Sequence, residues 1–254
     1  MNRTGFLAED GQAVVVALDH PLYSWPCRGL EDREHMLRLV ASAGADAVIA
    51  SYGTIRDHRA AFGKSAPILK LDVTTVALGG NYPLTEYVTA WTVEDALRLG
   101  VRSVLTFVQL GAPFELEALR TAGQVAAACD WHGLTYVCEI MPVESVMFPD
   151  PASSDAIAAA ARTGTELGAH VIKTTMPSPA AAVADAVACG APVILAGGAP
   201  TSDRGRLLAE VKSAIDLGAA GVAFGRNVWG ARDPAGMVAS LSDIVHGSRR
   251  TRAS

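Results

Sequence analysis

Residues 168–177 read Gly-Ala-His-Val-Ile-Lys-Thr-Thr-Met-Pro. A glycine that can end a helix is followed by an apolar run, and Pro177 then stops the strand. We expect a short buried strand with Lys173 near its carboxyl end. Burial disfavours the ammonium form, and a neutral amine can form a Schiff base with a ketone or aldehyde. The alternative is a lysine that reaches solvent or pairs with a carboxylate.

The same pattern recurs along the chain. A helical stretch ends in glycine and a short apolar strand follows, at 43–49, 99–105, 132–137, 167–172, 189–195 and 217–223. Glycine is favoured just past a helix end because it tolerates positive φ. A continuous apolar strand indicates burial on both faces, as in a parallel sheet.

Two further strands lack the glycine, so the pattern predicts strands at 13–19, 46–50, 67–72, 102–109, 134–140, 169–175, 191–196 and 219–224. Helices fit between them at 31–43, 55–62, 92–99, 114–131, 154–167, 179–188, 203–217 and 234–245, with Thr92, Asp203 and Asp233 as N-caps. This arrangement predicts one (β/α)8 TIM-barrel domain over 1–254. A doubly wound sheet would carry a G-x-G-x-x-G loop after the first strand, and Asp19-His20-Pro21 is not one.

Composition limits the partners and the location. Lys and Arg number 21 against 26 Asp and Glu, a net charge of −5, which argues against a general nucleic-acid surface. No apolar run reaches the roughly 18 residues of a membrane helix. The four cysteines form no C-x-x-C pair and suit buried thiols in a reducing compartment. We therefore expect a cytoplasmic protein without a membrane span.

Charged residues gather at the predicted strand ends, where barrels place their chemistry. Asp19, Lys70, Glu139 and Lys173 all lie there. Asp19 either relays a proton beside a Schiff-base lysine or caps the following turn. Lys70 either keeps a neighbouring lysine neutral or simply pairs with Asp19 or Asp72.

The last two strands end in Gly197-Gly198 and Gly225-Arg226. Barrels often bind phosphate there through backbone N–H groups, and an arginine adds a planar fork of donors. We expect an anionic ligand at this place, with His20 helping to bind the substrate. The histidines show no metal-ligand spacing, so neither a metal nor another cofactor is expected.

Several short motifs, in order along nearly the whole chain, resemble the class I (Schiff-base) aldolases of the archaeal fructose-bisphosphate aldolase type. That superfamily includes aldolase-like synthases of amino sugar acids and the autoinducer-processing thiolase. The matching segments are 17–21, 29–32, 69–71, 171–174, 196–198 and 225–229.

The resemblance implies a barrel, a phosphorylated ketose or dihydroxyacetone-phosphate-type substrate with an aldehyde partner, and a homo-oligomer. It matches Lys173 to the Schiff-base lysine, Asp19 to the first-strand aspartate, and the glycine ends with Arg226 to the phosphate site. One departure concerns the proton donor. The family carries tyrosine where this chain has Met141, and a thioether cannot donate a proton. Glu139, Tyr23 or a water would have to replace it, or the reaction differs.

The sequence therefore predicts a lyase that forms or breaks a C–C bond through an imine on Lys173. Two alternatives remain at this point. One is thiolase-like acyl transfer to coenzyme A on the same barrel, which fits the missing tyrosine. The other is a barrel that binds sugar phosphates without turnover.

Overall fold

Eight parallel strands close into a barrel in the order β1-β12-β11-β10-β9-β8-β4-β3. The computed structural model describes residues 5–74, 77–78, 86–177 and 182–250. The barrel strands are β1 (Ala13–Ala17), β3 (Ala47–Ala50), β4 (Ala66–Lys70), β8 (Ser103–Leu110), β9 (Thr135–Pro142), β10 (Val171–Thr175), β11 (Val193–Ala196) and β12 (Gly221–Phe224). Every predicted strand is present, so the predicted TIM barrel is confirmed; the assignment of 1–254 to one domain stays a prediction.

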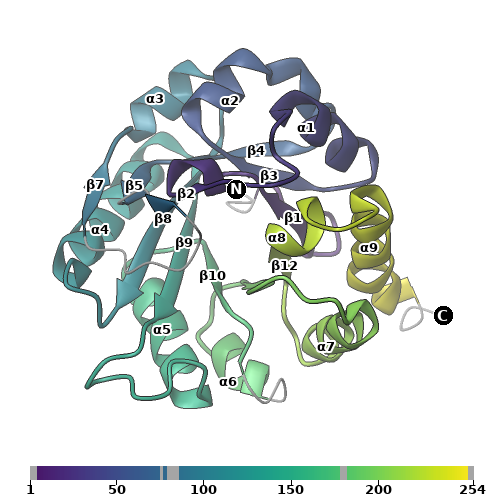
Figure 1. Cartoon of the computed structure of the whole chain (residues 1–254). Coiled ribbons are helices and arrows are strands. Elements are labelled where there is room, and N and C mark those ends of the chain that lie inside the picture. The colour runs from purple at the N-terminus through teal and green to yellow at the C-terminus, as the bar shows by residue number, and fades with distance from the viewer. Residues whose placement is uncertain (1–4, 75–76, 79–85, 178–181, 251–254) are drawn as a thin grey trace.

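Helices surround the strands (Figure 1). They are α1 (Arg33–Ser42), α2 (Tyr52–Asp57), α3 (Val93–Arg98), α4 (Glu115–His132), α5 (Ser154–Glu166), α6 (Val183–Val187), α7 (Arg204–Asp216), α8 (Arg226–Trp229) and α9 (Pro234–Arg250). The helix predicted over 55–62 is instead α2 followed by a 3-10 turn, η2 (Arg59–Phe62). Residues 179–181 of the predicted sixth helix lie outside the described residues, and α8 was not predicted.

The predicted helix starts are confirmed by side-chain caps. Asp203 accepts a hydrogen bond from the Arg206 N–H, and Thr92 forms a reciprocal capping box with Asp95. Asp233 accepts from the N–H of Gly236 at 2.9 Å. At the other end of α5, Gly168 has a φ of +95°, the backbone conformation that lets the chain leave the helix and enter β10.

Two apolar layers make the core. Alternate residues of the strands fill the barrel interior, among them Ile68, Leu105, Val137 and Val171, and the opposite faces pack against the helices. Side chains two positions further along a strand return to the interior, one layer closer to its carboxyl end. The interior layer above Val171 and Val137 therefore contains Lys173 and Glu139.

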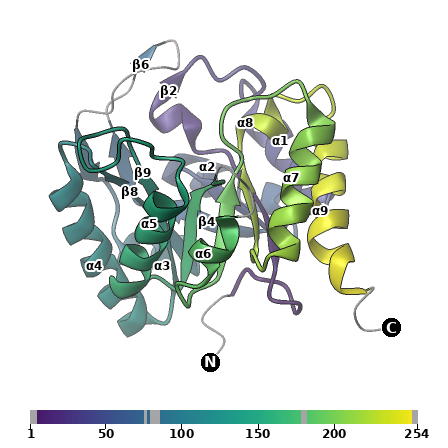
Figure 2. The ribbon, with the colours of Figure 1, turned by 90° about the horizontal axis from the view of Figure 1, so that it is seen from below.

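Short elements that the sequence pattern did not predict cover the carboxyl end of the barrel. A 3-10 turn, η1 (His20–Leu22), follows β1. Two small sheets pair β2 (Ser24–Trp25) with β6 (Ala77–Leu78), and β5 (Asp72–Thr74) with β7 (Tyr87–Thr89). Figure 2 shows β2, β6 and α8 gathered at this end. These pairs are too short to give a periodic signal in the sequence.

The four cysteines are buried and unbridged, as expected. Within the described ranges, no helix combines the length and the apolar character needed to cross a membrane.

A three-residue cluster ties the amino end of the barrel together. His246, on α9, contacts Asp10 Oδ2 through Nδ1 at 2.7 Å and Asp46 Oδ2 through Nε2 at 3.0 Å. Asp46 Oδ2 also accepts the Val14 N–H at 2.6 Å. Hydrogen bonds to Asp46 and Asp10 outweigh the effect of burial and raise the pKa of His246 to about 9. The cluster joins the last helix to β1 and to the start of β3.

Replacing His246 is expected to destabilise the protein in a pH-dependent way. Because the pKa is about 9 in the folded chain against 6.5 unfolded, the stabilisation is complete below pH 6.5 and is lost as the pH rises through 9. Urea unfolding of His246→Asn should show a loss of about 1–2 kcal/mol at pH 6, since water partly screens the pair. The loss should shrink towards zero at pH 10.

His35, which is exposed on α1, supplies the matched control. His35→Asn should leave the free energy of unfolding unchanged at both pH values. An equal loss for His246→Asn at pH 6 and pH 10 would show that packing, not charge, explains the role of this residue.

Candidate functional site

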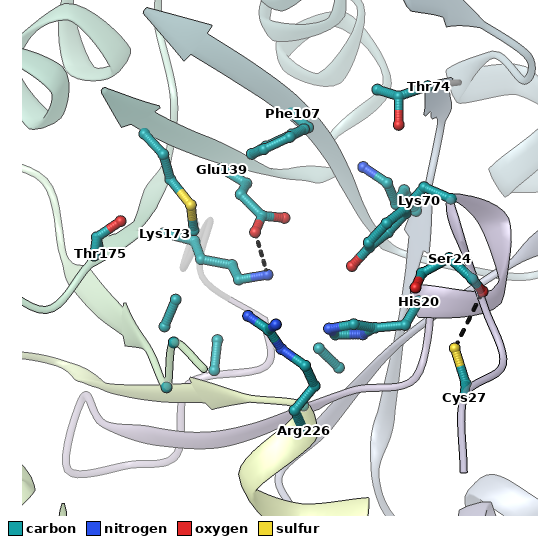
Figure 3. Close-up of a pocket in the computed structure, with 18 of the residues that line it drawn as sticks. His20, Ser24, Cys27, Lys70, Thr74, Phe107, Glu139, Lys173, Thr175 and Arg226 are labelled. Atoms are coloured by element: carbon teal, nitrogen blue, oxygen red, sulfur yellow. Dashed lines mark hydrogen bonds and ion pairs between the residues drawn. The ribbon is translucent and has the colours of Figure 1, made fainter. Parts of the chain in front are cut away.

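A cavity of about 490 Å³ opens at the carboxyl end of the barrel. Its wall is formed by the ends of several strands together with η1, the segment after it, and α8. Lys70, Glu139 and Lys173 enter it from β4, β9 and β10, and Arg226 enters from the start of α8 (Figure 3). Predicted site residues from distant parts of the chain therefore share one cavity.

Lys173 and Glu139 form an ion pair inside this cavity. The two residues are register partners on the adjacent strands β10 and β9, and Lys173 Nζ lies 2.6 Å from Glu139 Oε1. Only 4% of Lys173 and 9% of Glu139 is exposed. The predicted burial of the lysine is confirmed, and its partner is a carboxylate. This pair gives the amine a neighbour that can take its proton.

Lys70 has a different partner. Its ammonium donates to Asp72 Oδ1, and both side chains are buried. Asp72 Oδ2 accepts from the Tyr87 hydroxyl at 3.0 Å and from the Phe107 N–H. The Lys70 ammonium also lies 5.3 Å from the centre of the Phe107 ring, within cation–π range.

Burial acts to lower the pKa of Lys70, but the charges of Asp72, Asp19 and Glu139 together raise it. Lys70 is therefore a fixed positive charge beside the cavity. The pairing with Asp72, one of the alternatives that the sequence left open, is confirmed.

Asp19 is 1% exposed and does not line the cavity, whereas His20 does. Asp19 makes no side-chain capping bond to η1, so the alternative of a turn cap is wrong. Asp19 Oδ1 and His20 Nδ1 lie 3.8 Å apart, and neither atom has a hydrogen-bond partner among the described residues. Burial, and then the charges of Lys173 and Arg226, lower the pKa of His20 to about 3. The imidazole is neutral at ordinary pH.

The predicted phosphate-binding residues line the cavity together. Gly197, Gly198, Gly225 and Arg226 come from the ends of β11 and β12. A Cβ at Gly225 would lie 2.5 Å from His20 Cε1, so the first loop packs directly on this glycine. The Arg226 guanidinium makes no hydrogen bond or ion pair with any described residue, unlike the amino groups of Lys70 and Lys173. A bound anion would accept hydrogen bonds from this guanidinium.

Two positioning features were missed by the sequence reasoning. The buried Asn227 donates to the carbonyls of Gly197 at 2.7 Å and Ala199 at 3.0 Å, and it accepts the Thr201 N–H at 2.9 Å. It thereby fixes the β11 loop against α8. The second feature is Tyr87, whose hydroxyl donates to Asp72, the partner of Lys70. The sequence contained a signal for Asn227, because a polar residue directly follows Gly225-Arg226. No local sequence pattern marks Tyr87.

Met141 lines the cavity at the position where the resemblance expects tyrosine, and Tyr23 lines it from the first loop. In the described part of the chain, no three His, Cys, Asp or Glu side chains come together as a metal site. That no metal and no cofactor is needed stays a prediction.

Comparisons with known proteins agree with this geometry. Residues 13–231 match the profile described as DeoC/LacD family aldolase. The chain is 32% identical, over 92% of its length and 85% of the relative's, to a 2-amino-4,5-dihydroxy-6-oxo-7-(phosphonooxy)heptanoate synthase of Streptomyces griseus. It is 30% identical, over 96% and 93%, to a class 1 fructose-bisphosphate aldolase of Thermoproteus tenax.

A similar solved structure is that of an archaeal fructose-1,6-bisphosphate aldolase whose catalytic lysine is covalently bound to the carbinolamine intermediate of its substrate. It superposes with a TM-score of 0.84 at 26% identity, covering 96% of this chain and 97% of that one. Another, of a Schiff-base-forming fructose-1,6-bisphosphate aldolase, gives 0.84 at 27% identity, covering 95% and 97%. The profile match, the similarity over nearly the whole length and the barrel lead to one conclusion: this chain belongs to the DeoC/LacD aldolase family and is an enzyme of the class I, Schiff-base-forming type.

Proposed function

We propose that this enzyme forms or breaks a C–C bond of a phosphorylated ketose or dihydroxyacetone-phosphate-type substrate through an imine on Lys173. The observation that carries the proposal is the buried Lys173–Glu139 pair in a cavity where Arg226 has no anionic partner among the described residues. The names of two relatives support the substrate class, because one is a fructose-bisphosphate aldolase and the other a synthase of a phosphonooxy compound.

The first step needs a neutral amine. Glu139 Oε1, 2.6 Å from Lys173 Nζ, accepts a proton from the ammonium, and the freed amine attacks the ketone carbonyl. Loss of water then gives the iminium. Glu139 can return its proton to the departing hydroxyl, so one carboxyl group serves both halves of the step.

The iminium is an electron sink for the C–C step. In the cleavage direction, the hydroxyl of the carbon beyond the bond loses its proton, an aldehyde leaves, and the electrons of the broken bond form an enamine. We assign that proton to the Asp19–His20 pair, in which neutral His20 faces the cavity and Asp19 lies behind it. Because Met141 cannot donate, protonation of the enamine carbon falls to Glu139, Tyr23 or a water.

Arg226 and the backbone at Gly197, Gly198 and Gly225 are proposed to hold the phosphate. Lys70 is not assigned a phosphate contact, because its ammonium is already paired with Asp72. We also propose that the enzyme is a cytoplasmic homo-oligomer. The free, buried cysteines support a reducing compartment, and the family resemblance supports the oligomer.

Borohydride added with dihydroxyacetone phosphate should attach the ketone to Lys173 as a secondary amine. Peptide mass mapping should place the added mass on Lys173 and not on Lys70. Lys173→Met should abolish trapping and turnover, because the other lysine of the site, Lys70, has its pKa raised by Asp72, Asp19 and Glu139 against the effect of burial and stays an ammonium. Exposed Lys212, replaced by Met, is the control and should be trapped like the parent. Trapping at Lys70 would sink the assignment.

Glu139→Gln should lower kcat by about 100-fold or more, since the amide cannot accept the proton of Lys173. Rapid-quench borohydride trapping should show slower imine formation with similar binding of the ketone. The exposed Glu144, which follows the same strand but does not line the cavity, provides the control through Glu144→Gln. Unchanged trapping rates in Glu139→Gln would remove Glu139 from the mechanism.

Arg226→Met should raise KM for the phosphorylated ketone about 10- to 100-fold, because charge-assisted hydrogen bonds are lost, with a smaller change in kcat. The same variant should lose little towards dihydroxyacetone without phosphate. Arg232→Met, at an exposed arginine outside the cavity, should behave like the parent. An equal loss towards both ketones would mean that Arg226 does not bind the phosphate.

A further inference from the structure

The order of the strands gives the cavity two opposite sides. We call them the first pole, at Arg226 after β12, and the second pole, at Phe107 and Gln109 on β8. In the ring β1-β12-β11-β10-β9-β8-β4-β3, β12 and β8 lie diametrically across from each other. Arg226 follows β12, and Phe107 and Gln109 belong to β8. Figure 3 shows Phe107 and Thr74 across the cavity from Arg226, with Lys173 between them. A ketone whose phosphate lies at Arg226 therefore directs its aldehyde partner towards β8.

Among the cations that line the cavity, none gives that second pole an unpaired positive charge. Lys70, whose ammonium lies 5.3 Å from the centre of the Phe107 ring, is at this pole, but its charge is balanced by Asp72. The nitrogen of Lys173 is bound to the ketone in the imine. Arg226 is occupied by the first phosphate, and His20 is neutral. Residues 75–76, 79–85 and 178–181, outside the described ranges, contain no Lys, Arg or His in the sequence.

The outer wall at this pole is built from neutral side chains. Gln109, Met141 and Thr175 each lie two residues beyond Phe107, Glu139 and Lys173 on the same strands, and all three line the cavity. Gln109 and Met141 are register partners. Arg28, the cation next to rim residue Cys27, is exposed and does not line the cavity.

We infer that the aldehyde partner of this enzyme carries no phosphate. The inference rests on the proposed function, in which the ketone's phosphate occupies Arg226. A second phosphate beside Gln109, Met141 and Phe107 would lose water without gaining an unpaired counter-charge, because Lys70 is already paired with Asp72, and this is costly for an anion. An uncharged hydroxyaldehyde loses no such solvation, and the amide of Gln109 and the hydroxyl of Thr175 can bond its hydroxyl groups.

The test compares two aldehydes that differ only in the phosphate. With dihydroxyacetone phosphate as the ketone, kcat/KM is measured for D-glyceraldehyde and for D-glyceraldehyde 3-phosphate. We expect the unphosphorylated aldehyde to be preferred by at least about 10-fold, the effect of one unmade charge-assisted bond. Preference for the phosphorylated aldehyde, or equality, overturns the inference.

A designed charge makes the test independent of aldehyde reactivity. Gln109→Arg places a guanidinium at the empty pole and should shift the ratio of kcat/KM towards glyceraldehyde 3-phosphate by about 10-fold or more. Gln109→Met, which removes the amide without adding charge, should leave the ratio near that of the parent. A ratio unmoved by the arginine contradicts the assignment of this pole to the aldehyde.

Borohydride trapping with dihydroxyacetone phosphate alone distinguishes a failure of the proposed function from a failure of this inference. If Lys173 is not trapped, the proposed function and this inference fail together. If Lys173 is trapped but the phosphorylated aldehyde is preferred, the imine mechanism stands and only the inference fails.

Discussion

The ion pair between Lys173 and Glu139 is the interaction on which the site depends. The two residues are register partners on adjacent parallel strands, so the sheet itself brings their side chains together. A buried charge without a partner would cost several kcal/mol, and neither residue could stay in this layer alone. The pairing with Glu139 therefore offsets the cost of burying the Lys173 ammonium, and it also provides a carboxylate that can accept the lysine's proton.

The rest of the cavity follows from the balance of charge around this pair. Lys70 is neutralised by Asp72, which Tyr87 and the Phe107 N–H hold in place from both sides. Among the lysines and arginines that line the cavity, Arg226 is the one that the described residues leave without a partner. A cavity with one free positive charge at one pole and neutral side chains at the other is asymmetric, and this asymmetry gives a bound ketone phosphate one direction.

The two ends of the barrel have different tasks. At the carboxyl end, η1 and α8 come from opposite ends of the chain and meet where His20 packs over Gly225. At the amino end, His246 joins Asp10 and Asp46 and fastens the last helix to the first strands. The carboxyl end also holds buried polar atoms without a hydrogen-bond partner among the described residues, such as Asp19 Oδ1 and His20 Nδ1.

The barrel could be predicted from the amino-acid sequence alone, because a glycine after a helix followed by an apolar run is a local signal, and it recurs at six places. The sequence also placed Lys173, Glu139, Lys70 and Arg226 at strand ends, since the end of an apolar run is visible in the sequence. Which of these charges pair with one another depends on how the strands are arranged in the folded protein. Register and barrel closure join residues that are far apart in the chain, and no local pattern encodes them. The same reason explains why Tyr87, Asn227 and the two small sheets were missed, and why Asp19 lies behind His20 rather than in the cavity wall.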